Sequence, residues 1–286
     1  MKNEKLINIL SMLIIVLALL SALTGVLSNE VKEYADVTTS FGETVQLYQK
    51  GLYARDSVSV ASQAIAQDIV TLIFGIPFLF VALILLKKQK EKGLFLLTGT
   101  IGYFLYTYMS YSFVLIYNPF YLIYVALMAL SFYDFILCIM AMYKYDLKRQ
   151  FTDKFPVKSL SIFLYISGLM VGFMWLGRIL PTLISGTAPY GLEHYSTLGI
   201  QTLDLGFIVP ACFLTAYLLG KEKQWGYLLS IVLVIKMVTM TGAVSAMTIS
   251  MNLNGISVSI AEMLMFPALL LICIIFMIKI FKEIKV

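Results

Sequence analysis

Six ionisable residues lie inside the long apolar stretches of this 286-residue chain. They are Asp68, Asp134, Arg178, Asp204, Lys236 and Glu262. Placing a charge in the hydrocarbon core of a bilayer costs at least about 2.5–3.5 kcal/mol, so such residues usually mark substrate, ion or proton pathways, or pair with one another. The chemistry that the sequence offers is therefore the binding of a polar solute, or the transfer of protons, inside a membrane.

Four polar residues at helical spacing predict where this site lies. Glu193, Thr197, Gln201 and Asp204 follow one another at steps of four, four and three residues, which places them on one face of a helix. At a rise of 1.5 Å per residue, Asp204 would lie about 10 Å below the outer membrane surface, with Glu262 at a similar depth. Because a polar helix face inside a membrane needs a polar or aqueous neighbour, we expect an outward-facing polar cavity.

The ammonium of Lys236 is expected near the middle of the membrane. We expect Asp204 or Glu262 to neutralise it, with Asp134 as the deeper alternative, because an unpaired buried ammonium tends to lose its proton. The competing interpretation is that these charges form ion pairs that only fix the rotation of the helices.

Three further candidate residues lie nearer the outer surface. Asp68 and Arg178 are shallow enough to serve either in the cavity or as interfacial anchors. His194, the only histidine, has a side chain that titrates near neutrality, although a single histidine in a loop is more often incidental.

The stretch at 94–116 is rich in hydroxyl groups. A helix surrounded by lipid has no use for so many, so this helix is expected to lie at the centre of the protein. Tyr103 and Tyr106 share one of its faces and would offer hydroxyl groups and rings to a solute. Hydrogen bonding between helices, together with an aromatic belt at the interface, is the simpler alternative. The hydroxyl-bearing residues are Tyr103, Tyr106, Thr107, Tyr108, Ser110, Tyr111 and Ser112.

Signatures of soluble enzyme chemistry are absent from the sequence. There is no Walker loop, dinucleotide fingerprint or HExxH pair, and Cys138, Cys212 and Cys273 form no CxxC pair. A single histidine cannot build a site that needs several imidazoles. The sequence thus predicts no metal and no cofactor, and an enzyme is the less favoured class.

Two short motifs resemble signatures of the presenilin-type intramembrane aspartyl proteases. Tyr133-Asp134 and the Pro-Ala-Leu sequence at 267–269 match two of the three signatures. The third, GxGD, is replaced around Asp204 by Thr-Leu-Asp-Leu-Gly, and the two aspartates differ by more than about 10 Å in expected depth. Because the two acids of such a dyad share a proton at close range, the resemblance does not extend to catalysis.

Composition predicts the fold that positions these residues. With 60% hydrophobic and 13% charged residues, the chain is far more apolar than a soluble protein, in which about 25% are charged. Its apolar stretches are about as long as a bilayer core is thick, which predicts an all-α, polytopic membrane helix bundle. We expect a single transmembrane domain over 1–286 without a soluble domain, with about eight spans near 6–28, 65–86, 94–116, 120–143, 160–181, 197–219, 225–247 and 257–278, an outer segment at 29–62 and an outer loop at 182–196.

The basic residues predict the orientation of the bundle. Sixteen of the 21 lie in connections on one side of the membrane and three on the other, so both termini are expected in the cytoplasm, with the first span retained. Only three are arginine, which favours a bacterial inner membrane as the location. Because the lysines cluster at span ends, they are topology signals rather than a nucleic-acid site. The expected partners are the lipid bilayer and a small solute; no oligomeric state is predicted.

A shift of 133 residues aligns the second span with the sixth. Pro77 then meets Pro210 and Gly93 meets Gly226, across two lysine-rich turns. Each half would hold four helices, and four crossings return the chain to the same side, so the repeats would be parallel. The alignment would place the acids Asp68 and Asp204 near the outer ends of two proline-containing helices. Chance similarity of apolar segments is the alternative.

These features favour a membrane protein that binds or transports a small solute, coupled to protons through Asp204, Glu262 or Asp134. One alternative is an intramembrane or lipid-modifying enzyme that uses the same acids for general acid–base chemistry. The other is a non-catalytic sensor or assembly partner. A cavity that reaches both Asp204 and Lys236 would favour the first function.

The predicted orientation can be tested by cysteine labelling. With the native cysteines replaced by serine, cysteines placed at Asp36 and at Lys88 should react with an impermeant thiol reagent from opposite sides of the membrane, because one lies in the outer segment and the other in a basic inner turn. The reaction is compared before and after cells are permeabilised. Labelling of both positions from the same side would contradict the orientation.

Overall fold

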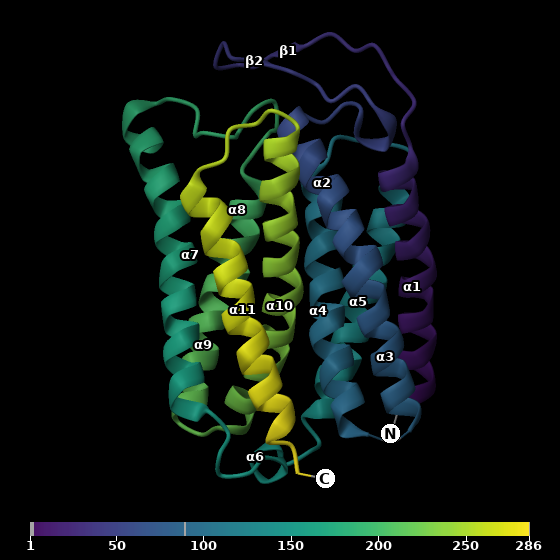
Figure 1. The fold of residues 1–286 in the computed structure, drawn as a ribbon, viewed down its shortest axis with the longest axis vertical. Helices are drawn as coiled ribbons and strands as arrows, with labels where there is room; N and C mark the ends of the chain where they lie inside the picture. Colours follow the sequence, from purple (N-terminus) through teal and green to yellow (C-terminus); the bar gives the residue numbers. More distant parts are fainter. Residues whose placement is uncertain (1–2, 89, 286) are drawn as a thin grey trace.

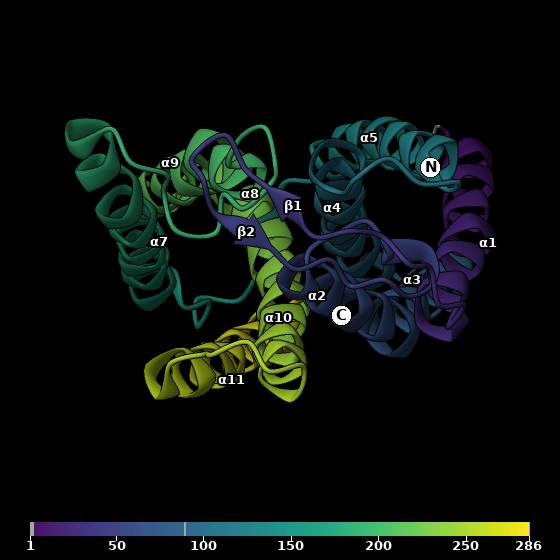
Figure 2. The ribbon, with the colours of Figure 1, turned by 90° about the horizontal axis from the view of Figure 1, so that it is seen from above.

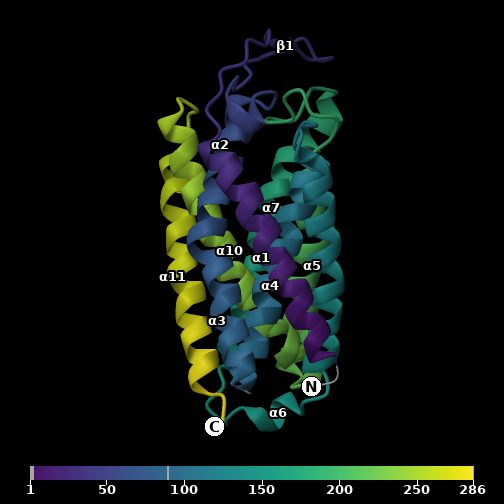
Figure 3. The ribbon, with the colours of Figure 1, turned by 90° about the vertical axis from the view of Figure 1, so that its right-hand side faces the viewer.

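Eight long helical segments run side by side and form an elongated bundle (Figure 1). The computed structural model describes residues 3–88 and 90–285. Within these residues, seven segments are long and apolar enough to cross a membrane. The eighth, α4 (Glu91–Val114), is of similar length but contains the hydroxyl-rich stretch. The protein is therefore a multi-pass membrane protein, and both ends of its chain lie at the same end of the bundle (Figure 3).

The eight segments agree with the predicted spans, with differences at their ends. In chain order they are α1 (Glu4–Leu27), α2 (Val58–Val70) followed by α3 (Ile76–Lys87), α4, α5 (Tyr121–Met142), α7 (Val157–Ser185), α8 (Gly199–Leu203) followed by α9 (Val209–Gly220), α10 (Gln224–Leu253) and α11 (Ile260–Lys282). A short helix, α6 (Leu147–Gln150), lies at the end of the bundle that holds the termini (Figure 1).

Four predicted boundaries are wrong by four residues or more; among them, the seventh and eighth segments end at Leu253 and Lys282 instead of near 247 and 278. The second segment begins seven residues earlier than expected, at Val58, because the Ser57 hydroxyl caps it by accepting a hydrogen bond from the backbone N–H of Val60 at 3.1 Å. The fifth continues through Pro181 and ends at Gly186, whose φ of 69° stops the helix. The predicted outer segment and outer loop therefore correspond to residues 28–57 and 186–198.

Two helices form the centre of the bundle. α10 packs against α2, α4, α9 and α11, and α4 packs against α3, α5 and α10. In the view from above, α7 and α9 lie on one side of this centre, and α1, α3 and α5 on the other (Figure 2). The expectation that the hydroxyl-rich helix is central is confirmed.

Residues 28–57 cover the end of the bundle opposite to the termini, which we call the hairpin end. The strands β1 (Val37–Thr38) and β2 (Thr44–Val45) pair in antiparallel fashion, and a 3₁₀ turn, η1 (Gly51–Tyr53), leads back toward α2. Few apolar residues of this segment are buried, and contacts with the ends of the helices fix its place.

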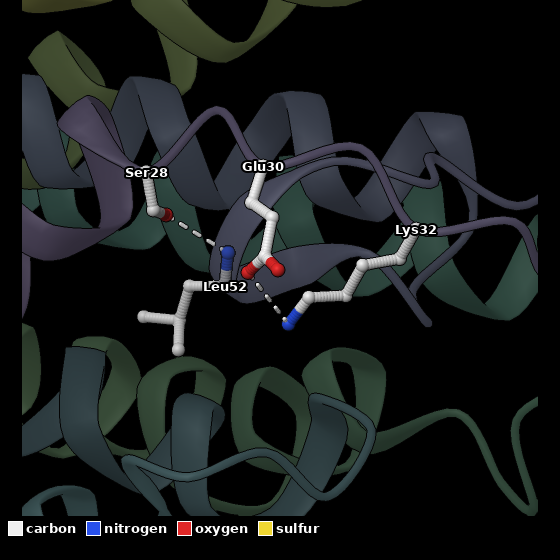
Figure 4. A network of polar contacts seen from close by, with 4 residues as sticks. All are labelled: Ser28, Glu30, Lys32 and Leu52. Carbon is white, nitrogen blue, oxygen red and sulfur yellow. Dashed lines mark hydrogen bonds and ion pairs between the residues drawn. The ribbon is translucent and has the colours of Figure 1, made fainter.

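One such contact ties η1 to the end of α1. The Ser28 hydroxyl accepts a hydrogen bond from the backbone N–H of Leu52 at 2.9 Å, and beside it Lys32 pairs with Glu30 at 3.7 Å (Figure 4). Gly51 is required here because its φ is 56° and a Cβ would lie 1.9 Å from the carbonyl oxygen of Ser28.

The second and sixth segments are interrupted in the same way. A π-helical turn, η2 (Thr71–Gly75), precedes Pro77, and another, η3 (Asp204–Ile208), precedes Pro210. A proline inside a helix cannot donate its backbone hydrogen bond and clashes with the carbonyl four residues earlier, so the chain widens locally. The elements η3, α9 and α10 each begin 133 residues after η2, α3 and α4.

The turns that follow α3 and α9 are also alike. A Cβ on Gly93 would lie 2.5 Å from the backbone nitrogen of Leu86, and a Cβ on Gly226 would lie 2.3 Å from that of Leu219. Each central helix thus starts so close to the preceding helix that only glycine fits.

Substitution of these glycines tests the close packing. Gly226→Ala should lower the free energy of unfolding by roughly 1–3 kcal/mol, because the new methyl group meets backbone that has no room to move. Gly177→Ala on α7 is the control: no atom lies within 4 Å of its Cβ position, and alanine favours the helix. Thermal unfolding in detergent measures both. A Gly226→Ala protein as stable as the control would contradict the packing.

Candidate functional site

A cavity of about 1020 Å³ lies beside the central helix α10. Its walls come from α2, α4, α7, α8 with η3, α9, α10 and α11, and loops of the hairpin end form its rim. Asp204 and Lys236 both line it. The cavity therefore reaches both Asp204 and Lys236. Contact of these two residues with a cavity favours a solute site, whereas enclosed charges would have favoured a structural role.

Asp204 connects two walls of the cavity. Its Oδ1 accepts a hydrogen bond from the Tyr106 hydroxyl of α4 at 2.6 Å, and its Oδ2 accepts one from the Trp175 indole N–H of α7 at 2.9 Å. Asp204 is the first residue of η3, and the carboxylate is thus placed at the widened turn that Pro210 imposes.

Lys236 lies on α10 with its Nζ 4.0 Å from the centre of the Tyr106 ring. A cation over a ring face is stabilised by the ring quadrupole, and more strongly when it is away from water. Among the described residues, no carboxylate oxygen lies within 4.0 Å of this ammonium. We expected Asp204 or Glu262 to neutralise Lys236. Asp204 acts on the ammonium electrostatically without a direct ion pair, and its hydrogen bond to Tyr106 connects it to the ring that Lys236 faces.

Seven of the eleven predicted site residues line the cavity, and four do not. Those that line it are Gln201, Asp204, Glu262, Lys236, Tyr106, Arg178 and Glu193. Tyr103, Asp68, Asp134 and His194 lie outside it.

Asp68 is neither a cavity residue nor an interfacial anchor. It is 1% exposed, and its carboxylate accepts hydrogen bonds from the hydroxyls of Tyr53 at 2.5 Å and Tyr111 at 3.0 Å. A Cβ on Gly25 of α1 would collide with it, so α1 closes over the acid. Asp68 therefore joins α1, η1 and α4, and its role is to hold these elements together.

Asp134 lies on the opposite side of the bundle centre from Asp204. It is buried, and its Oδ2 accepts a hydrogen bond from the Ser11 hydroxyl of α1 at 2.7 Å. Each of the two acids thus has its own partners on different helices, which agrees with the absence of an aspartyl dyad.

Tyr103 also has a structural place. Its hydroxyl accepts a hydrogen bond from the Gln67 amide at 2.6 Å and lies 2.8 Å from the hydroxyl of Thr71, so it holds α2 and η2 against α4. Of the two tyrosines predicted to face a solute, only Tyr106 lines the cavity.

The polar stripe from Glu193 to Asp204 reaches the cavity by a different route from the one predicted. α8 begins only at Gly199, so Glu193 and Thr197 lie in the preceding loop and share no helix face with Gln201. Glu193 has a φ of 50°, a turn conformation that folds the loop over the rim. All four residues of the stripe nevertheless line the cavity.

Several lining residues carried no signal in the sequence. Trp175 and Tyr190 hold the guanidinium of Arg178, whose Cζ lies 5.6 Å and 4.8 Å from the two ring centres. The spacing of three between Trp175 and Arg178 places them on one face of α7, which is a signal in retrospect. Six methionines make up much of the apolar wall: Met170, Met174, Met237, Met240, Met247 and Met251.

Contacts between helices also lie toward the end of the bundle that holds the termini. Phe163 of α7 and Phe276 of α11 meet with ring centres 4.9 Å apart. Further contacts join the two halves of the chain: Tyr143 stacks on Trp225 at 4.7 Å, and Lys148 pairs with Glu222 at 2.6 Å. The rim of the cavity lies at the hairpin end.

Comparison with protein-family models, curated proteins and solved structures gave no match. The residues that the structure describes contain no cluster of three or more His, Cys, Asp or Glu that could hold a metal ion. The class of protein that the fold and the cavity define is a multi-pass membrane protein with a charged internal cavity.

A polar cluster at the rim joins the loop at 186–198 to the base of the hairpin segment. Asp56 Oδ1 accepts hydrogen bonds from the backbone N–H of Ile116 at 2.9 Å and the Tyr195 hydroxyl at 3.0 Å. Glu193 accepts one from the Ser57 hydroxyl. His194 lies outside the cavity, with its Nε2 3.2 Å from the carbonyl oxygen of Arg55, and partial burial lowers its pKa.

The two acids of this rim cluster have raised pKa values. Burial is the main cause for both; it raises the pKa of Asp56 to about 7, with a smaller contribution from the nearby Glu193. An acid whose pKa is higher in the folded protein stabilises the fold fully at a pH below its unfolded pKa of about 3.9, and this stabilisation is lost as the pH rises through its folded pKa.

The rim should therefore become less stable as the pH rises from about 4 to about 7. Asp56→Asn keeps an acceptor for Ile116 and Tyr195 but cannot ionise, so it should raise the melting temperature near pH 8 and leave it little changed near pH 5. Glu193 would contribute to the pH dependence of the melting temperature that remains in this variant. Equal pH dependence in both proteins would contradict the assignment to Asp56.

Proposed function

We propose that this protein is a solute transporter of a bacterial inner membrane, with the hairpin end outside the cell and both termini in the cytoplasm. The observation that carries the proposal is the Asp204–Tyr106–Lys236 group in a cavity whose rim lies at the hairpin end. Buried charges are costly in a membrane, and their position in a cavity is typical of a substrate pathway.

The location of the charges favours a functional role over a purely structural one. Thr71 and Tyr103 occupy the positions 133 residues before Asp204 and Lys236, and their hydroxyls lie 2.8 Å apart. In the first half of the chain, two neutral side chains therefore make the contact between helices at the corresponding positions. A charged pair in the second half is not needed to hold the helices, which supports a role in binding.

We further propose that the chain consists of two parallel four-helix repeats. The support is the 133-residue offset of the π-helical turns, the helices that follow them and the central helices, together with the glycines that start α4 and α10. Transporters built from parallel repeats rock one half against the other around a central site. The contacts of Lys148 with Glu222 and of Tyr143 with Trp225 would close the inner end in the outward-facing state.

Cys212 offers a native probe of this function. All three cysteines are buried, but Cys212, which is 2% exposed, is the one of the three that lines the cavity, so its modification reports opening of the cavity. In proteoliposomes, a small impermeant methanethiosulfonate should modify Cys212 from the hairpin side, and more slowly from the other side as the second state forms. Mass spectrometry identifies the modified cysteine. Absence of modification, or equal modification of all three cysteines, would contradict an accessible cavity; modification from the hairpin side alone would contradict transport.

The same assay should respond to Asp204. Asp204→Asn removes one acceptor from the link between Tyr106 and Trp175, so we expect the outward-facing state to weaken and modification of Cys212 from the inner side to increase. Asp134→Asn, a buried acid outside the cavity, is the matched control and should leave the ratio of the two rates unchanged.

A further inference from the structure

The ammonium of Lys236 has hydrogen-bonding capacity that the protein does not use. The side chain is 7% exposed and lines the cavity, and Tyr106 presents only its ring face to it. Among residues 3–88 and 90–285, no oxygen accepts a hydrogen bond from Nζ, and no acid pairs with it. A buried ammonium has three donors and is costly without acceptors, so the cavity lacks a group that Lys236 would bind.

Arg178 is a second cation in the cavity without a paired acid. Its guanidinium lies over the rings of Trp175 and Tyr190, and its Nε is buried without an acceptor. Glu193 and Glu262 act on it only at longer range, since neither comes within ion-pair distance in the described chain.

The acids of the cavity, in contrast, are mostly occupied. Asp204 accepts hydrogen bonds from Tyr106 and Trp175, and Glu193 accepts one from Ser57. Glu262 closes the capping box of its own helix α11. The remaining acid, Glu43, is exposed on the hairpin. The cavity is lined by four acidic and two basic side chains, and this count alone would favour a cationic ligand. The hydrogen-bond donors without an acceptor, however, are on the two basic side chains, which favours an anionic ligand.

Most of the remaining cavity wall is apolar. The six methionines provide flexible, polarisable surface that adapts to irregular ligands. α7 packs against α9, and α11 against α10, while the rings of Phe163 on α7 and Phe276 on α11 lie 4.9 Å apart. Nearer the hairpin end the two helices are apart (Figure 2), although Met174 of one and Phe266 of the other both line the cavity.

We propose that the ligand is an acidic amphiphile: a molecule with a phosphate or carboxylate head and an apolar chain. This inference rests on the proposed function and names its substrate class. The acidic head binds Lys236, with Arg178 as the cation nearer the rim. The chain lies against the methionine wall and extends between α7 and α11 toward the bilayer.

The test uses protection of Cys212 in lipid nanodiscs. Dodecyl phosphate and dodecanoate are the acidic probes, dodecylamine is the cationic probe of equal chain length, and inorganic phosphate is the head without a chain. At roughly ten times its Kd, a bound probe should slow the modification of Cys212 about tenfold by mass action. We expect this with at least one acidic amphiphile, and no slowing with dodecylamine or inorganic phosphate. The stronger acidic probe identifies the head group.

Two variants test whether the protection of Cys212 depends on the charge of Lys236. Lys236→Met should abolish protection by the acidic probe, and Lys236→Arg should retain it, because both conserve the apolar stem while only arginine keeps the charge. Unprotected modification of Cys212 and the melting temperature show that each variant is folded. Asp134→Asn is the control outside the cavity and should be protected like the wild-type protein.

The outcomes separate this inference from the proposed function. Cys212 could react from the hairpin side without protection by the acidic amphiphiles, or with equal protection by dodecylamine. In either case the substrate class is wrong, while the accessible cavity of the proposed function still stands. Equal protection by inorganic phosphate would overturn the need for a chain. Protection that persists in Lys236→Met would overturn the role of Lys236. If Cys212 does not react at all, the proposed function itself fails.

Discussion

The structure depends on one costly arrangement: the ammonium of Lys236 buried on the central helix α10, over the ring of Tyr106. A charge in the middle of a membrane has to be compensated by rings, acids or water. Tyr106 contributes to this compensation in two ways. Its ring faces the ammonium, and its hydroxyl donates a hydrogen bond to Asp204. Asp204 in turn binds Trp175, so α4, α7, η3 and α10 are held around the cavity by a single chain of polar contacts.

The two halves of the chain use similar backbone features for different purposes. In the first half, Thr71, Tyr103 and Gln67 form a neutral and enclosed network, and the acid Asp68 is sealed by two tyrosine hydroxyls and α1. In the second half, Asp204 and Lys236 face open volume. The same widened turn before a proline thus supports a packed core in one half and a charged cavity in the other. Enclosed hydrogen bonds rigidify a structure, whereas unfilled donors in a cavity are available for a ligand.

The rim of the cavity is controlled by groups of a different kind. Hydrogen bonds of Ser57 with Glu193 and of Tyr195 with Asp56 join the base of the hairpin segment to the loop before α8. The raised pKa of Asp56 follows from its burial, and it means that ionisation near neutral pH weakens the rim. The contacts next to the cavity entrance therefore weaken as Asp56 ionises, while Tyr106 contributes to holding the helices around the cavity.

The sequence by itself determined the membrane helix bundle and the residues that bear charge within its long segments. These follow from local properties: the length of apolar runs, the cost of a buried charge and the positions of proline and glycine. It could not determine which charges share a cavity. Asp68 and Asp204 look alike in the sequence, but η1 and α1 close over the first while α7 and α10 leave space beside the second. Burial, free donors and the methionine wall depend on how distant helices pack, and only the tertiary structure decides that.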